Sequence, residues 1–394
     1  MSPRGSYGGD TWQIFYRALD TLDLGSLNLS NMPGRDLWVV PGSFRDRRVP
    51  NFDSTDPNIK PMYQDSTSIG TEYQLGSEMV FGAHFVHNDL GRTIEDIGAV
   101  DAQGNETYII GNPGEGLAEF QFPSGLTPFG QPVPKPKRQY DALELTLSKR
   151  FSNNYFWSAS YVLSRLYGNY SGIAASEEIS TPTTGTSSAT AQQQAGSISR
   201  PGGNANRAWD IDEIFWDSHG NLDVLGRLPT DRPHVVKLYG SYMAPFGTQF
   251  GVNFYGGSGT PLTTYVNTVN QTAAFVEGRG DMGRTDVLTR TDLLVSHELK
   301  VGGGNKRVRL ELNLLNAFNQ KTSRHQFNFL NRGAGAPRAS SAIDLSGTDL
   351  RNGYDYNALI AGSADHANAY DPRYGKSDLF EPGTQGYFTV KFLF

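Results

Sequence analysis

The sequence predicts an all-β protein, on three observations. Several stretches alternate apolar and polar residues with a period of two, as β-strands do. The 394 residues include 45 Gly, 19 Tyr and 22 Phe, a composition that suits short twisted strands joined by polar connections. Long amphipathic helical patterns are missing, and with a mean hydropathy of -0.45 no apolar run approaches the length of a membrane-spanning helix. Strands would therefore make any membrane crossing.

The period-two pattern predicts ten strands. They cover residues 11–17, 64–75, 78–88, 137–150, 153–166, 232–244, 248–258, 283–299, 306–318 and 385–394. Within the fourth, Leu143, Leu145 and Leu147 point one way and the intervening polar residues the other. A soluble sandwich with a buried apolar face has the same alternation, so the pattern leaves both architectures open.

The C-terminal strand has one strongly apolar face. That face carries Phe388, Val390, Phe392 and Phe394. A final strand that ends on Phe resembles the assembly signal of bacterial outer-membrane barrels, which implies the barrel-assembly machinery as a partner. The alternative is the terminal strand of a soluble sandwich.

The connections between the predicted strands alternate in length. Four are tight: Gly76-Ser77, Phe151-Ser152 before Asn153-Asn154, Pro245-Phe246-Gly247, and the run from Val301 to Asn305. The others, at 18–63, 89–136, 167–231, 259–282 and 319–384, exceed the usual loops of compact soluble domains. Short periplasmic turns and long extracellular loops are typical of outer-membrane barrels. We therefore expect a transmembrane antiparallel β-barrel in the outer membrane, in contact with the lipid bilayer.

Some aromatic residues near the predicted strand ends fit the interfacial girdles of such a barrel. They are Tyr140, Tyr155, Phe156, Trp157, Tyr242 and Phe246. Ordinary packing is the alternative explanation for each of them.

Charge and cysteine content narrow the possible functions. The net charge is -6 and no dense Lys/Arg block occurs, so we expect no nucleic-acid partner. The chain has no cysteine, which excludes disulfides and thiolate metal sites. No basic and apolar secretory signal is visible over residues 1–20, so either the chain is soluble or Met1 is not the start of the native product. The Ser/Thr/Ala/Gln-rich segment 179–199 is predicted to be a loop tip.

No catalytic or cofactor-binding set emerges from the sequence. A Gly-x-Ser-x-Gly elbow is missing, and the protein is predicted not to be an enzyme and to need no cofactor. The acidic segment 209–223 offers one weak calcium candidate, whose oxygen ligands would be Asp210, Asp212, Asp217 and Asp223. It lacks the ligand spacing of an EF-hand, and a solvated acidic loop is the plainer interpretation.

Six blocks, spread over nearly the whole chain, resemble the C-terminal barrel half of Oar-like TonB-dependent outer-membrane receptors. They lie at 37–54, 60–76, 108–116, 140–172, 232–261 and 310–320. The most distinctive are YDALELTLSKRFSNNY in the fourth block and the strand TDRPHVVKLYGSY, which leads into the fifth. The LNAFN of the last block resembles a late Asn-hydrophobic-Phe-Asn element of such barrels.

The resemblance implies ligand reception or active uptake, energised by the TonB complex, through a large barrel of about 22 strands with an internal plug. No plug, TonB-box-like segment or N-terminal regulatory-like domain is recognisable here. We therefore expect residues 1–394 to be the C-terminal part of such a barrel, coupled to TonB through a missing N-terminal part. The ligand would be a polymer, a peptide or a glycan. A surface anchor or adhesin, a passive pore, and a soluble secreted β-sandwich remain as alternatives.

Overall fold

The structure is a computed structural model of the chain. It describes residues 55–100, 106–119, 133–170, 213–214, 216–222, 224–268, 273–302, 306–332, 341–345, 348–363 and 369–393. The predicted strand 11–17 and the low-complexity segment 179–199 lie outside these residues.

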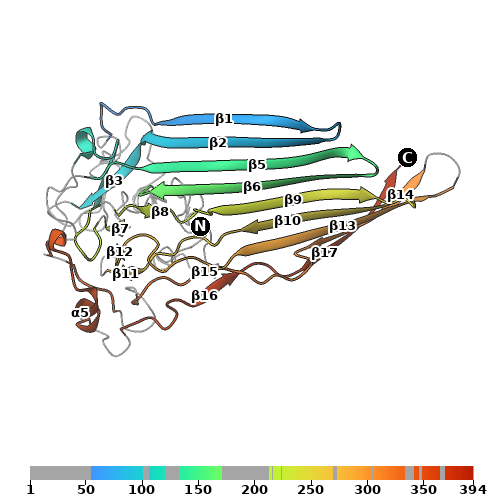
Figure 1. Ribbon diagram of the computed structural model, residues 1–394. Coiled ribbons are helices and arrows are strands. Elements are labelled where there is room, and N and C mark those ends of the chain that lie inside the picture. Colours follow the sequence, from blue (N-terminus) through green and yellow to red (C-terminus); the bar gives the residue numbers. More distant parts are fainter. Residues whose placement is uncertain are drawn as a thin grey trace, which may run out of the picture.

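One long antiparallel sheet dominates the molecule, and its strands lie side by side in chain order (Figure 1). From edge to edge they are β1 (Tyr63–Leu75), β2 (Met79–Arg92), β5 (Arg138–Ser152), β6 (Tyr155–Gly168), β9 (His234–Met243), β10 (Thr248–Gly257), β13 (Leu288–Lys300), β14 (Arg307–Leu315) and β17 (Gln385–Leu393). The short β8 (Gly226–Arg227) pairs with the end of β6. These nine long strands confirm the predicted strands from 64–75 onward.

Tight turns connect the strands at one end of the sheet. Between β5 and β6, Asn153 and Asn154 both have positive φ, at 50° and 68°. Two successive residues of this kind give a hairpin turn whose twist matches that of the flanking strands, and Asn tolerates the conformation better than most residues. Gly76, Gly247 and Gly302 have positive φ in the other three turns. The predicted short connections are confirmed.

Two predicted strand boundaries were too wide. The strand expected at 283–299 begins only at Leu288, and the strand expected at 306–318 ends at Leu315. The second ends there because Asn316 has a φ of 48°, which breaks the extended backbone.

The sheet has one apolar and one polar face, and the apolar face is exposed. The strand register places Leu143 beside Phe85 on this face, and Leu312 beside Phe388. Ile69 is 71% exposed and Phe388 is 67% exposed. The other exposed apolar side chains on this face include Phe85, Leu143, Leu163, Val236, Leu238, Phe250, Val252, Val295, Leu312, Val390 and Phe392. A soluble sandwich would bury such a face, so the soluble alternative does not fit the structure.

The long connections fold together at the other end of the sheet into what we call the cap (Figure 1). The cap consists of the described residues between β2 and β5, between β6 and β9, between β10 and β13, and between β14 and β17. It contains the strand pair β3 (Glu95–Val100) and β4 (Glu106–Gly111), the sheet of β7 (Glu213–Ile214), β11 (Tyr265–Asn267) and β12 (Ala273–Phe275), the pair β15 (Ser323–Gln326) and β16 (Ser377–Phe380), and the helices η1 (Gly116–Ala118), η2 (Leu350–Asn352) and α5 (Tyr356–Ala361). None of the helices in the described ranges is long and apolar enough to cross a membrane.

The principal buried core lies in the cap. It comprises Ala118, Val133, Tyr170, Trp216, Val266, Ala274, Val276, Ile343, Leu345, Leu350, Tyr354, Ile360 and Ala369. A second cluster is largely aromatic, and in it the ring of Tyr265 lies 5.2 Å from that of Phe275 and 5.6 Å from that of Phe329. Since the residues of the principal core come from all four long connections, the connections stabilise one another.

The sheet does not close on itself. In the part of the chain that the structure describes, β1 pairs only with β2, and β17 pairs only with β14. Because β1 and β17 are the first and the last of nine antiparallel strands, with seven between them, both run from the cap toward the tight turns. A direct seam between them would be parallel, whereas barrels of this class are antiparallel throughout.

Candidate functional site

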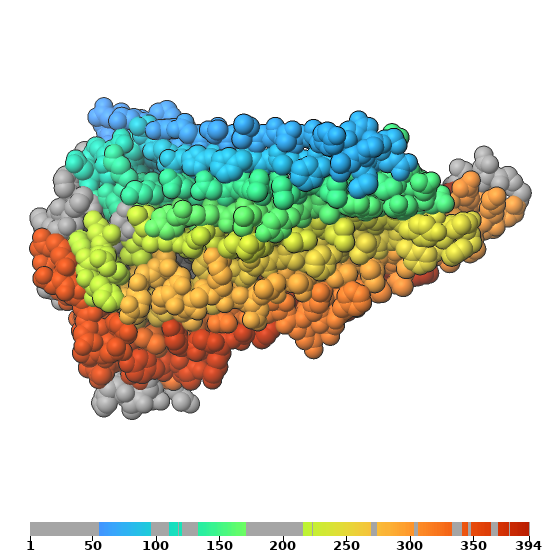
Figure 2. Space-filling model, in the orientation of Figure 1, coloured from blue at the N-terminus to red at the C-terminus, as the bar shows by residue number. Residues whose placement is uncertain are grey.

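The polar face of the sheet carries charged and hydrogen-bonding side chains along all nine strands. They include Gln64, Ser66, Glu72, His84, Glu144, Ser148, Ser160, Lys237, Asn253, Arg290, Asp292, Glu298, Arg309, Glu311, Asn313, Thr389 and Lys391. Neighbouring strands from β1 to β13 form one continuous surface along the sheet (Figure 2). This arrangement suits a wall with hydrocarbon on one side and water on the other.

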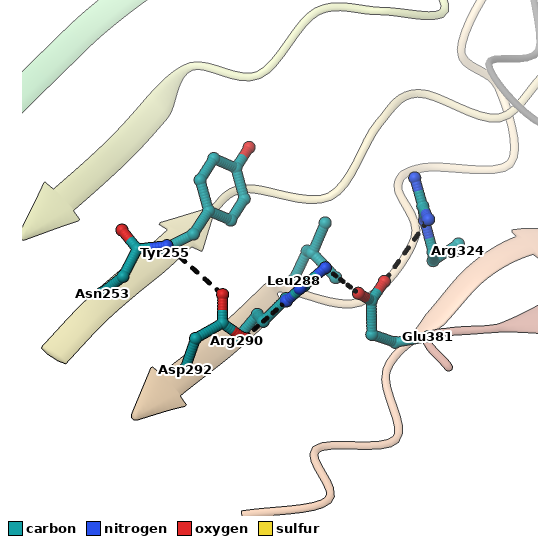
Figure 3. Close-up of a pocket in the computed structure, with 7 residues that line it drawn as sticks. All are labelled: Asn253, Tyr255, Leu288, Arg290, Asp292, Arg324 and Glu381. Atoms are coloured by element: carbon teal, nitrogen blue, oxygen red, sulfur yellow. Dashed lines mark hydrogen bonds and ion pairs between the residues drawn. The ribbon is translucent and has the colours of Figure 1, made fainter. Parts of the chain in front are cut away.

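A pocket opens on this polar face where the sheet meets the cap (Figure 3). Its volume is about 400 Å³. It is lined by Asn253 and Tyr255 of β10, Leu288, Arg290 and Asp292 of β13, Arg324 of β15, and Glu381 from the segment that precedes β17. We call it the wall pocket.

The register of β10 and β13 places the first half of the wall pocket. Asn253 lies opposite Asp292, and Tyr255 lies opposite Arg290, so the four side chains share one face. Asp292 accepts hydrogen bonds from Arg290 Nε at 2.9 Å, from the backbone N–H of Asn316 at 2.9 Å and from Asn253 Nδ2 at 3.3 Å. Asp292 is therefore held by protein donors and is fixed in place.

The cap supplies the second half. Glu381 is 8% exposed and lies between two guanidinium groups (Figure 3). Its Oε1 is 3.7 Å from Arg290 Nη1, and its Oε2 is 3.4 Å from Arg324 Nη1. Glu381 Oε2 and Arg324 Nε are buried without a hydrogen-bond partner in the protein. The site thus has an unfilled acceptor beside an unfilled donor, and buried groups of this kind favour an added polar partner.

Asn316, the first asparagine of the LNAFN block, joins the two halves. Its Nδ2 donates to the carbonyl of Gln320 at 3.0 Å and to the carbonyl of Pro382 at 2.7 Å, and its Oδ1 accepts from the N–H of Gln320 at 2.8 Å. The contact with Pro382 positions the residue next to Glu381. The motif noticed in the sequence is therefore a structural clamp beside the wall pocket.

Sequence reasoning missed the wall pocket itself. Arg290, Arg324 and Glu381 are far apart in the chain, and β15 was not predicted. The available signal was the placement of Arg290 and Asp292 on the polar positions of one predicted strand, where the two opposite charges lie side by side.

Of the four residues of the predicted calcium site, only Asp217 lies within the described residues. Asp217 is buried, and its carboxylate accepts bonds from the N–H of His219 at 3.0 Å, the N–H of Asn221 at 2.9 Å and Asn221 Nδ2 at 2.8 Å. This carboxylate holds a turn. Asp210, Asp212 and Asp223 lie outside the described residues, within which no group of three metal-ligating side chains occurs. The calcium site stays a prediction.

The predicted assembly strand forms β17. Phe388, Val390 and Phe392 lie on the apolar face, opposite Leu312, Leu310 and Val308 of β14. Phe394 lies outside the described residues. The pattern of the strand is as expected, and its role in assembly stays a prediction.

Comparison with known proteins identifies the class of this sheet. The family model described as "Outer membrane beta barrel domain" matches residues 40–259, more than half of the chain. The chain belongs to the outer membrane β-barrel family. It is also 30% identical, over 270 residues, to the TonB-dependent transporter Oar of Myxococcus xanthus. That match covers 67% of this chain but only 22% of the relative, so the chain spans about a fifth of that protein's length.

Three solved structures of outer-membrane proteins are similar to parts of this chain. The outer-membrane transporter YddB of Escherichia coli is similar over 69% of this chain and 30% of its own, with a TM-score of 0.41 and 12% identity. The ferric-catecholate import receptor Fiu of Escherichia coli is similar over 85% of this chain and 28% of its own, with a TM-score of 0.36 and 12% identity. The copper transporter OprC is similar over 86% of this chain and 32% of its own, with a TM-score of 0.35 and 10% identity.

Membership of this family places the protein in the bacterial outer membrane and its apolar face against lipid. The tight turns then face the periplasm and the cap faces the cell exterior.

The predicted aromatic girdle needs a correction. Tyr155 and Tyr242 face lipid near the turns, whereas Tyr140 and Phe156 point to the polar face, where Phe156 packs edge-on against Tyr239. Phe156 adjoins Tyr155 in the strand and must point the opposite way.

Proposed function

We propose that this chain is part of the barrel of a TonB-dependent receptor, which binds a ligand at the cell surface and takes it up across the outer membrane. The observation that carries the proposal is the wall pocket, a polar site at the outer end of the water-facing wall. The identity to a TonB-dependent transporter supports it. A receptor of this kind carries out transport rather than catalysis, and we propose no enzymatic role.

We further propose that the nine strands belong to a larger barrel. An antiparallel closure requires an odd number of additional strands between β17 and β1, because these two edges run in the same direction. A passive pore made of the nine strands alone would need a parallel seam between β1 and β17 and is therefore disfavoured.

Cross-linking in cells tests the coupling to TonB without knowledge of the ligand. Formaldehyde-treated cells of the organism that makes the protein should yield a complex that reacts with antibodies to this chain and to TonB. Cells that lack TonB are the control. If the protein is abundant in the outer membrane and no such complex forms, the uptake proposal fails, and a surface anchor or adhesin becomes the better explanation.

A further inference from the structure

The charges that line the wall pocket cancel. Arg290 and Arg324 contribute two positive charges, and Asp292 and Glu381 contribute two negative charges. The other lining residues, Asn253, Tyr255 and Leu288, are neutral. A charged ligand would leave one charge unbalanced beside the buried Glu381, and burial makes such an imbalance costly. The lining therefore favours a neutral ligand.

The open hydrogen-bonding positions specify the ligand further. Asp292 is already filled by three donors, but Glu381 Oε2 lacks a hydrogen bond, and so does Arg324 Nε. Since Arg324 Nη1 lies only 3.4 Å from Glu381 Oε2, the vacant acceptor and the arginine are side by side. A hydroxyl group donates and accepts at one oxygen atom, whereas a carboxylate only accepts and an ammonium only donates. A hydroxyl therefore satisfies this corner of the pocket best.

The remaining lining suits the rest of a sugar ring. Tyr255 presents an aromatic ring and Leu288 an apolar side chain, on which the C–H face of a sugar can pack (Figure 3). Asn253 adds an amide, which both donates and accepts. The volume of about 400 Å³ lies within the range of small-ligand sites.

We propose that the wall pocket binds an uncharged carbohydrate, with a hydroxyl of the sugar bridging Glu381 and Arg324 and the ring packing on Tyr255. This inference rests on the proposed role in ligand reception and names the ligand class. A peptide is the competing ligand, and it is disfavoured because an amide places its donor and its acceptor on different atoms.

Calorimetry on the full protein, purified in detergent from outer membranes, tests the ligand class. Maltotriose and cellotriose are the neutral probes, trigalacturonate is the anionic probe and trialanine is the peptide probe. We expect at least one neutral trisaccharide to bind and to bind more tightly than the other two probes. Tighter binding of trigalacturonate or trialanine overturns the proposal. Failure of every probe to bind at concentrations up to about 10 mM, which corresponds to very weak affinity, also overturns it.

The variant Glu381→Gln provides a sharper test. Loss of the charged acceptor should weaken the neutral trisaccharide about 10-fold or more. Because the pocket then carries a net positive charge, trigalacturonate should bind more tightly than it does to the unchanged protein. Glu144→Gln is the matched control, since Glu144 lies on the same polar face on β5, away from the wall pocket. Equal effects of the two variants overturn the proposal.

A second variant guards against a folding defect in the first. Tyr255→Ala removes the packing surface and leaves all four charges in place. It should weaken the neutral trisaccharide about 10-fold without any gain for trigalacturonate. Heat-dependent mobility in gel electrophoresis checks that each variant is folded. The TonB cross-link is scored separately, so a wrong ligand class and a wrong uptake proposal give different results.

Discussion

At the scale of single residues, Asn316 links the strand β14 to the connection that carries Glu381 of the wall pocket. It is buried, has a left-handed φ of 48° and makes three side-chain hydrogen bonds to the connection before β17. A positive φ alone explains why Asn is found at such a turn, but not why it is buried. The hydrogen bonds supply that reason.

Asn316→Ala should lower the free energy of unfolding by about 2–4 kcal/mol, because it leaves buried backbone groups without partners. Urea titration followed by heat-dependent gel mobility measures the effect. Asn319→Ala is the control, since Asn319 also has a positive φ, of 50°, but is exposed. If both variants lose the same stability, backbone strain and not the clamp accounts for the effect.

Glu115 in the cap is the second residue with a testable charge effect. Lys60 and Lys135 lie 3.0 and 3.3 Å from its carboxylate, and Arg92 lies 3.7 Å away. The hydrogen bond from Lys60, followed by that from Lys135, lowers the pKa of Glu115 below its ordinary value of 4.5. The ionised group therefore stabilises the fold above pH 4.5, and this contribution is lost as the pH falls through the lowered pKa.

We expect Glu115→Gln to make the cap more sensitive to proteolysis at pH 6, and the difference from the unchanged protein to shrink toward pH 3. Limited proteolysis with an acid-tolerant protease across this range measures it. Glu119→Gln, at an exposed neighbouring position, should have little effect. A difference that persists unchanged at pH 3 would contradict the role of charge.

At the scale of elements, the sequence predicted the long strands and tight turns well but not the cap. Each long strand can be recognised by its strict alternation of apolar and polar residues, as at Leu143, Leu145 and Leu147. The alternation is regular because one face of the sheet contacts lipid along its whole length. The cap strands are only two to six residues long, and their core gathers residues from distant segments, such as Trp216 and Ile343, into one buried cluster. Local periodicity carries no information about such contacts. The wall pocket was missed for the same reason.

The element that most needs a functional test is β17. Deletion of Phe394 should reduce the amount of protein in the outer membrane, because the terminal aromatic is the predicted assembly signal. Quantitative immunoblots of isolated outer membranes, normalised to messenger RNA, measure the loss. Phe246→Ala is the control, since Phe246 is also an exposed aromatic residue, 68% exposed, but belongs to the turn between β9 and β10 and not to the terminal strand. Unchanged abundance after the deletion would remove the assembly hypothesis.

At the scale of the whole molecule, the parallel directions of β1 and β17 predict a barrel that needs further strands. The 394 residues have a mass of 43.2 kDa. An antibody to the cap should therefore detect, in unboiled and boiled outer membranes, a heat-shifted band well above that mass. A heat-shifted band at 43.2 kDa would mean that these strands close without additional ones, and a pore or anchor would replace the receptor.

The shared core of the cap limits how this surface can diversify. Its buried residues come from four connections that are separate in the sequence, among them Ala118, Trp216, Val266 and Ile360. A change in the backbone of one connection alters the packing surface of the others. Exchange of a single connection with a relative should therefore damage the cap, whereas exchange of all four together should preserve it. New binding specificities would then be inherited as a block, with single substitutions in the wall pocket as the route to finer adjustment.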